Sequence, residues 1–151
     1  MVKPYPYLNG DDYFLLKLEI MATNPVPIHI SGDSNVVITC NSNAAYFQRV
    51  TLTWTVLRSQ FKVIFSGSGE DKNMTTNEGE TIYKFTTKQG ITINALFEYS
   101  PTGSRGPFSQ AVVQNPNYVP IDNPTIISVT SEDSNDQDNN DSYLIISVTG
   151  F

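Results

Sequence analysis

The segment RVTLTWTVL, residues 49–57, alternates strictly between apolar and polar side chains. Val50, Leu52, Trp54 and Val56 fall on one side, and the threonines between them fall on the other. A period of two residues is the pattern of a β-strand with one buried face, and it does not collect these side chains on one face of a helix. The segment therefore predicts a half-buried strand, and any fold for this chain must contain a sheet.

Further strand-like segments follow along the chain, separated by Gly, Pro, Asn and Asp. No window of eleven or more residues shows the period of an amphipathic helix. The predicted strands cover residues 13–20, 36–40, 49–57, 61–66, 81–87, 91–100, 110–114, 125–130 and 143–149. About nine short strands spaced by turn residues predict an all-β fold, an antiparallel β-sandwich or a jelly-roll-like arrangement.

The length of 151 residues indicates one domain that is large enough to bury a core. We expect residues 26–151 to form this domain and residues 1–25 to be an N-terminal extension that could add a strand. Cys40 is the single cysteine, so an intrachain disulfide is excluded, and its apolar neighbours predict a small core residue at a strand end.

The sequence shows neither the pattern of a standard signal peptide nor that of a membrane-spanning segment. The N-terminal residues lack the basic and apolar regions of a standard signal peptide, which predicts synthesis in the cytoplasm and leaves export or cell-surface association open. The apolar segment YFLLKLEIMA is too short and too charged to cross a bilayer, so no membrane insertion is expected.

The net charge of −6 is concentrated in the last third of the chain. Residues 1–105 hold nine basic and nine acidic side chains, whereas residues 106–151 hold six acidic ones and neither Lys nor Arg. A nucleic-acid-binding protein would show a basic patch, so that class is excluded. The local excess of negative charge favours a cation as the partner.

Most of that charge lies in SEDSNDQDNNDSYLII, residues 131–146, between two predicted strands. Carboxylates this close repel one another unless a cation neutralises them, and carboxylate and amide oxygens suit Ca²⁺. The segment is not an EF-hand, because counting from Asp133 or Asp136 puts an aspartate where that motif has Gly. A solvated acidic loop without a metal is the simpler alternative.

The spacing S-E-D-x-x-D-x-D-x-N-D, followed by ten residues to Phe151, resembles the C-terminal signature of a lectin family. These are the two-calcium, fucose/mannose-binding soluble bacterial lectins of the pseudomonad fucose lectin type. The segment VVITCNSNAAYFQRVTLTW resembles a second part of the family, in which an Asn ends an early strand and a three-residue loop selects the sugar. In this chain the Asn is Asn41, and the loop is Ser42–Ala44.

The resemblance implies a site with two calcium ions. The implied ligands are Asn41, Glu132, Asp136, Asp138, Asn140, Asp141 and the α-carboxylate of Phe151. Asp138 and Asp141 would bridge the two ions. The carboxylate of Phe151 would reach the site from a partner subunit of a homodimer or homotetramer, although the family has Gly at this position.

The same resemblance implies the residues that contact the sugar. Asp133 and groups of Ser42, Asn43 and Ala44 would form hydrogen bonds to it, and Ser42 favours fucose over mannose. The sequence thus predicts a calcium-dependent carbohydrate-binding lectin whose two Ca²⁺ coordinate the hydroxyls of fucose and/or mannose in glycans.

Two other function classes are weighed against the lectin. A structural or adhesion β-sandwich module would use calcium only to stabilise the acidic loop. An enzyme is not expected, because the one histidine, His29, has no partner motif and a glycan hydrolase would need two further carboxylates. Only a lectin would show sugar-dependent stabilisation of the native state.

Overall fold

A computed structural model gives the structure of the protein and describes residues 21–120, 124–133 and 141–151. These residues form an 11-stranded, wholly antiparallel sheet and contain no helix. The strands are β1 (Met21–Ala22), β2 (Val26–Ile30), β3 (Ser34–Val56), β4 (Ser59–Asn73), β5 (Ile82–Thr87), β6 (Ile91–Ser100), β7 (Ser109–Gln110), β8 (Val112–Gln114), β9 (Asn117–Pro120), β10 (Thr125–Glu132) and β11 (Ser142–Gly150). The predicted all-β, antiparallel fold is confirmed.

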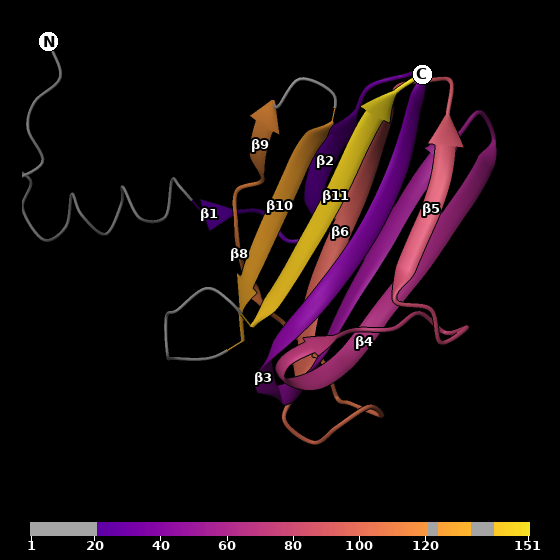
Figure 1. The fold of residues 1–151 in the computed structure, drawn as a ribbon. Helices are drawn as coiled ribbons and strands as arrows, with labels where there is room; N and C mark the ends of the chain where they lie inside the picture. Colours follow the sequence, from indigo (N-terminus) through magenta and orange to yellow (C-terminus); the bar gives the residue numbers. More distant parts are fainter. Residues whose placement is uncertain (1–20, 121–123, 134–140) are drawn as a thin grey trace, which may run out of the picture.

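The long strand β3 belongs to both layers of the fold. Around Ile38 it pairs with β11 on one side and β5 on the other, and around Leu52 it pairs with β6 and β4. One layer therefore contains β10, β11, the first half of β3 and β5, and the other contains β2, β6, the second half of β3 and β4. Figure 1 shows β10 and β11 in front of β2 and β6.

The core lies between these layers and follows the alternation of the strands. It includes Val36, Ile38, Cys40, Leu144 and Ile146 from the first layer and Val50, Leu52, Trp54 and Phe97 from the second. The buried face predicted for residues 49–57 is confirmed, with Val56 only partly buried. Cys40 is also a core residue as predicted, and burial raises the pKa of its thiol because the thiolate would lose its hydration.

Strand β2 lies between the strands predicted at 13–20 and 36–40, where no strand is predicted because the prolines indicate a loop. Val26, Ile28 and Ile30 nevertheless alternate inward and pack on the core. Pro27 is compatible with this strand because β2 is the last strand of its layer, where a residue without an N–H group can face solvent.

Strands β3 and β4 bend together from one layer into the other. Their register shifts between Ser42 and Ala44 and again between Ala44 and Gln48, and Gly69 of β4 has a φ of +108° that favours glycine. The sequence predicts two separate strands joined by a loop at Ser42–Ala44, and this is wrong. The segment is a bulged part of one continuous strand, β3.

Other differences concern single segments. Strand β9 lies between the strands predicted at 110–114 and 125–130, and β4 is longer than the strand predicted at 61–66. The strand predicted at residues 13–20 lies outside the described residues. The division between an extension and a main domain at residues 25 and 26 stays a prediction.

Candidate functional site

Three carboxylates meet where β10 ends and β11 begins. Glu132 and Asp133 come from the end of β10, and Asp141 directly precedes β11. One oxygen from each lies within 4.8 Å of the others, and the three residues are only 5%, 7% and 2% exposed. Like charges brought together away from water are unfavourable unless a cation accompanies them, so this cluster could hold a metal ion.

The pairing of β10 with β11 brings the carboxylates together. Ser131 lies opposite Ser142, and the Asp141 N–H donates to the carbonyl of Ser131 at 2.9 Å. The Asp133 N–H donates to Oδ2 of Asp141 at 2.7 Å. This backbone donor fixes the orientation of the Asp141 carboxylate within the cluster.

Gln48 joins this hairpin to β3 from the other layer. Its Nε2 donates to Oδ2 of Asp133 at 2.9 Å, and its Oε1 accepts from Oγ of Ser142 at 3.0 Å. The same Nε2 donates to the carbonyl of Tyr46 at 3.2 Å, and the residue is fully buried. These bonds fix the orientation of the Asp133 carboxylate at a buried position.

Sequence reasoning did not identify Gln48, although a signal was present. Gln48 occupies the position before Val50, Leu52 and Trp54 on the inward side of the alternating strand. An amide at an inward position of an apolar alternation needs buried hydrogen-bond partners. That requirement could have drawn attention to the residue before the structure was known.

The structure brings the second predicted part of the site beside the acidic cluster. Asn41 lies opposite Tyr143 and Ser42 opposite Ser142, and the Asn43 N–H donates to the carbonyl of Asp141 at 2.9 Å. Residues more than ninety positions apart in the sequence are thus neighbours across the β3–β11 pair, as the resemblance implies.

Buried hydroxyl groups support the presence of a ligand here. Among the described residues, Oγ of Ser42 and Oγ of Ser131 are buried side-chain oxygens that have no hydrogen-bond partner. Buried polar atoms are normally satisfied, and those that are not point to a missing water, ion or ligand. The three carboxylates of the cluster are hard oxygen donors of the kind that fits a cation such as Ca²⁺.

The remaining predicted site residues are placed as follows. Ala44 is buried, whereas Asn41 and Asn43 are partly exposed, and Oδ1 of Asn43 accepts from the Asp71 N–H at 2.9 Å. Asp133, predicted to contact the sugar, lies with Glu132 and Asp141 in the cluster. The predicted ligands Asp136, Asp138 and Asn140 lie outside the described residues.

Phe151 lies at the other end of β11 from Asp141. The strand spans nine residues, about 30 Å at a rise of about 3.3 Å per residue. The Phe151 N–H donates to the carbonyl of Asp33, and its side chain is exposed. The α-carboxylate of this residue is therefore too distant to reach the acidic cluster of its own chain.

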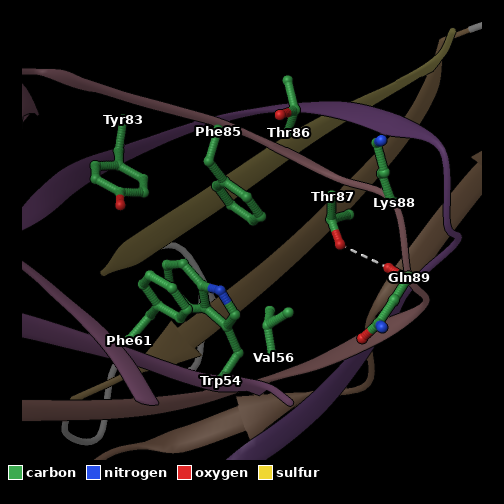
Figure 2. A pocket seen from close by; sticks show the side chains of 9 residues that line it. All are labelled: Trp54, Val56, Phe61, Tyr83, Phe85, Thr86, Thr87, Lys88 and Gln89. Atoms are coloured by element: carbon green, nitrogen blue, oxygen red, sulfur yellow. Dashed lines mark hydrogen bonds between the residues drawn. The ribbon is translucent and has the colours of Figure 1, made fainter. Parts of the chain in front are cut away.

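A hollow of about 340 Å³ opens between β5 and the strands β3 and β4, away from the cluster (Figure 2). Its lining residues are Trp54, Val56, Phe61, Tyr83, Phe85, Thr86, Thr87, Lys88 and Gln89. Stacked rings occupy both sides of Trp54, with centroid distances of 5.6 Å to Phe61 and 4.8 Å to Phe85. The hollow is thus an aromatic edge of the core, and convergent polar groups are found at the acidic cluster instead.

These observations define the class of protein as an all-β binding protein with an acidic, metal-competent site. A family model described as Fucose-binding lectin II (PA-IIL) matches residues 28–150. The chain belongs to this family, and the predicted family resemblance is confirmed. Members are carbohydrate-binding proteins rather than enzymes, which agrees with the prediction for this chain.

Three solved structures share the fold. A Chromobacterium violaceum lectin, CV2L, in complex with alpha-methyl-fucoside has a TM-score of 0.59 and 20% identity, covering 83% of this chain and 96% of the lectin. A Ralstonia solanacearum high-affinity mannose-binding lectin has a TM-score of 0.58 and 21% identity, with the same coverage of 83% and 96%. The C-terminal domain of the BC2L-C lectin from Burkholderia cenocepacia has a TM-score of 0.54 and 17% identity, covering 80% and 92%.

No curated protein matches this chain in sequence. Within the residues that the structure describes, no helix is long and apolar enough to cross a membrane.

Proposed function

We propose that the protein is a calcium-dependent lectin that binds fucose- or mannose-containing glycans. The observation that carries the proposal is the buried cluster of Glu132, Asp133 and Asp141 directly beside Asn41 and Ser42. Membership of a fucose-binding lectin family supports the sugar, and the oxygen donor set supports the ion. The solved lectins with this fold include one in complex with a fucoside and one described as mannose-binding.

Two calcium ions per site are part of the proposal. Four of the proposed ligands, Glu132, Asp136, Asp138 and Asp141, carry four negative charges, which equal the charge of two Ca²⁺. Asn41 and Asn140 would add neutral oxygens. Bound Ca²⁺ would supply open coordination positions for vicinal sugar hydroxyls, because two ions need more oxygens than these side chains provide.

The chain itself orients the ligand set. Gln48 holds one oxygen of Asp133, and the Asp133 N–H holds one oxygen of Asp141, so both carboxylates are fixed before a ligand arrives. Ser42 has a buried hydroxyl oxygen without a partner among the described residues, and it is available for a sugar hydroxyl or a bound water. Such preorganisation lowers the entropic cost of binding a small polar ligand.

The geometry adds a second possible contact to the role proposed for Asp133. Its 7% exposure and its position within 4.8 Å of the other two carboxylates support a contact with a cation, in addition to the sugar contact that the family resemblance implies. We therefore propose that Asp133 acts at the boundary between metal and sugar. Asp133→Asn should weaken both calcium and sugar binding in calorimetric titrations, whereas a purely sugar-contacting residue would leave calcium affinity unchanged.

We also propose that the chain forms a homodimer or homotetramer. A terminal carboxylate at Phe151 could act only in the site of another copy, because about 30 Å of strand separates it from Asp141. Ile82, Val119 and Tyr143 are exposed on strands of the first layer and would be covered by a second copy. Light scattering would give the oligomeric state, and residues added after Phe151 should weaken sugar binding if its carboxylate is used.

The test of the proposed function is binding to immobilised fucose or mannose. Binding should be lost on adding a chelator and restored by excess Ca²⁺. Asp138→Ala should remove most of the binding, because it deletes a proposed bridging ligand. Retention that does not respond to the chelator would contradict the calcium mechanism, and near-wild-type affinity of Asp138→Ala would contradict that assignment.

One observation favours a second candidate, a module in which calcium only stabilises the fold. The three carboxylates are buried at the base of the β10–β11 hairpin, where a cation would relieve repulsion even without a sugar. The two candidates differ in whether sugar stabilises the calcium-loaded protein.

A further inference from the structure

Two tyrosines form a stacked pair beside the acidic cluster. The ring centroids of Tyr46 and Tyr99 are 6.0 Å apart, and the ring planes differ by 11°. Tyr46 is 38% exposed although Tyr99 stacks on it. Because Tyr99 covers one face of Tyr46, the other face is the one that a ligand can reach.

Gln48 fixes the position of this pair relative to the cluster. In the register of β3 and β6, Tyr99 lies directly opposite Gln48, so their side chains share one face of the layer. The Gln48 Nε2 donates both to the carbonyl of Tyr46 and to Oδ2 of Asp133. One nitrogen thus contacts the backbone of Tyr46 and a carboxylate of the proposed sugar site.

The bulge of β3 presents Tyr46 at the surface. From Ala44 to Gln48, β3 advances by four residues while β4 advances by two, from Gly69 to Gly67. The additional residues are unpaired with β4, and they carry Tyr46 outward. The proposed sugar-binding segment ends at Ala44, and only the small residue Ala45 separates it from Tyr46 along the chain.

We propose that Tyr46, backed by Tyr99, is an apolar subsite for the group attached to the metal-bound sugar. This inference rests on the proposed function. Cations take up the hydroxyls of the first sugar, whereas the next pyranose ring or an aglycone presents a face of C–H groups. Such a face packs well against the electron-rich face of an aromatic ring.

The ligand class is therefore a glycoside whose substituent next to the bound sugar has an apolar face. The methyl group of a methyl glycoside offers little apolar surface to Tyr46, whereas a second sugar ring or an aryl group offers a whole face. The subsite would select among fucosylated or mannosylated glycans by their second residue, without changing which monosaccharide the cluster prefers.

Calorimetric titration of the full chain in Ca²⁺ tests the subsite with two probes, methyl and p-nitrophenyl glycosides of fucose, or of mannose if that sugar binds more tightly. The wild-type protein should bind the aryl glycoside roughly two- to ten-fold more tightly than the methyl glycoside. Tyr46→Ala should lose this gain and keep its affinity for the methyl glycoside. Tyr46→Phe should keep the gain, because the ring and not the hydroxyl makes the contact.

Phe61→Ala provides the matched control, since Phe61 is an aromatic residue of similar exposure, 41%, far from the cluster. It should leave both affinities unchanged. A wild-type protein without the aryl gain, or a Tyr46→Ala variant that retains it, would overturn the subsite alone. A wild-type protein that binds neither sugar would overturn the proposed function, and the subsite with it.

Discussion

The two parts of the β3 strand place opposite chemistry on the same inward face. Near the bulge the inward residues are Ser42 and Gln48. Ser42 lies opposite Ser142 of β11, and Gln48 bonds to the Asp133 carboxylate and the Ser142 hydroxyl. Six residues after Gln48 the inward residue is Trp54, which stacks between two phenylalanines. Strand β3 thus has a polar end, where we propose that the ligand binds, and an aromatic end, which stabilises the fold.

The aromatic end stabilises the fold in the usual way. The burial of Trp54 and Phe85 removes large apolar surfaces from water, and the contact between their rings adds a smaller stabilising free energy. The acidic end works against folding, because three carboxylates are withdrawn from water close to one another. Local departures of this kind from good packing are expected at functional sites, where a ligand completes the structure.

The largest expected effect on folding comes from Trp54→Ala. The substitution removes a ring stacked on two others and should lower the free energy of unfolding by about 3–5 kcal/mol. Urea unfolding measures this free energy. It is followed by circular dichroism and not by tryptophan fluorescence, because the variant lacks the single tryptophan of the chain. The sugar affinity of the folded fraction should stay within about two-fold, and a larger loss would show that the two ends are coupled.

Next in size is the effect of Asp141→Asn on binding. The amide keeps an oxygen that can accept from the Asp133 N–H, but it removes the charge that a cation requires. Sugar affinity should fall by about a hundred-fold, on the order of 3 kcal/mol, while stability in chelator stays equal or rises. Glu78→Gln, which removes an exposed charge elsewhere, is the control and should change neither quantity.

A smaller loss is expected for Gln48→Met. The variant keeps the side-chain volume but leaves Oδ2 of Asp133 and Oγ of Ser142 without their donor and acceptor. Stability should fall by about 1–3 kcal/mol, and calcium should bind more weakly in calorimetric titrations. Gln60→Met, at an exposed glutamine of β4, should show neither change. If Gln48→Met binds calcium as the wild type does, Gln48 does not position the site.

The smallest effect should follow Phe61→Ala at the aromatic end. Phe61 stacks on Trp54 but is 41% exposed, so we expect a loss of about 1 kcal/mol in unfolding free energy. Trp54 fluorescence should shift to longer wavelength because its indole gains contact with water. An unchanged emission maximum would mean that Phe61 does not shield this end from solvent.

The sequence predicted those features that depend on local pattern. The alternation at Val50, Leu52 and Trp54 identifies a half-buried strand, and the charge in residues 131–141 identifies the acidic site. It did not predict β2, because Pro27 indicates a loop unless the edge position of the strand is known. Local signals describe each strand separately, and the position of a strand within a layer depends on partners distant in the sequence.

In the candidate site, too, some features follow from the sequence and others depend on partners distant in the sequence. The proximity of Asn41 to Asp141 followed from the family resemblance and is present in the β3–β11 register and in the Asn43 hydrogen bond. The family resemblance implies a loop at Ser42–Ala44, whereas this segment is a bulged part of β3. An irregular but paired strand has no distinct composition in the sequence. The role of Gln48 depends on its hydrogen bond to Asp133, and that of Tyr46 on its stacking with Tyr99. Both partners are distant in the sequence, so the sequence pattern alone does not give these contacts.

Calcium-dependent sugar binding is tested most directly by the melting temperature with and without Ca²⁺ and with and without methyl fucoside or methyl mannoside. We expect Ca²⁺ to raise the melting temperature, sugar to raise it further in the presence of Ca²⁺, and sugar to have no effect in chelator, because ligands that bind only the native state stabilise it. A rise with Ca²⁺ but none with either sugar would identify a structural calcium site. A rise with sugar in chelator would contradict binding through the metal.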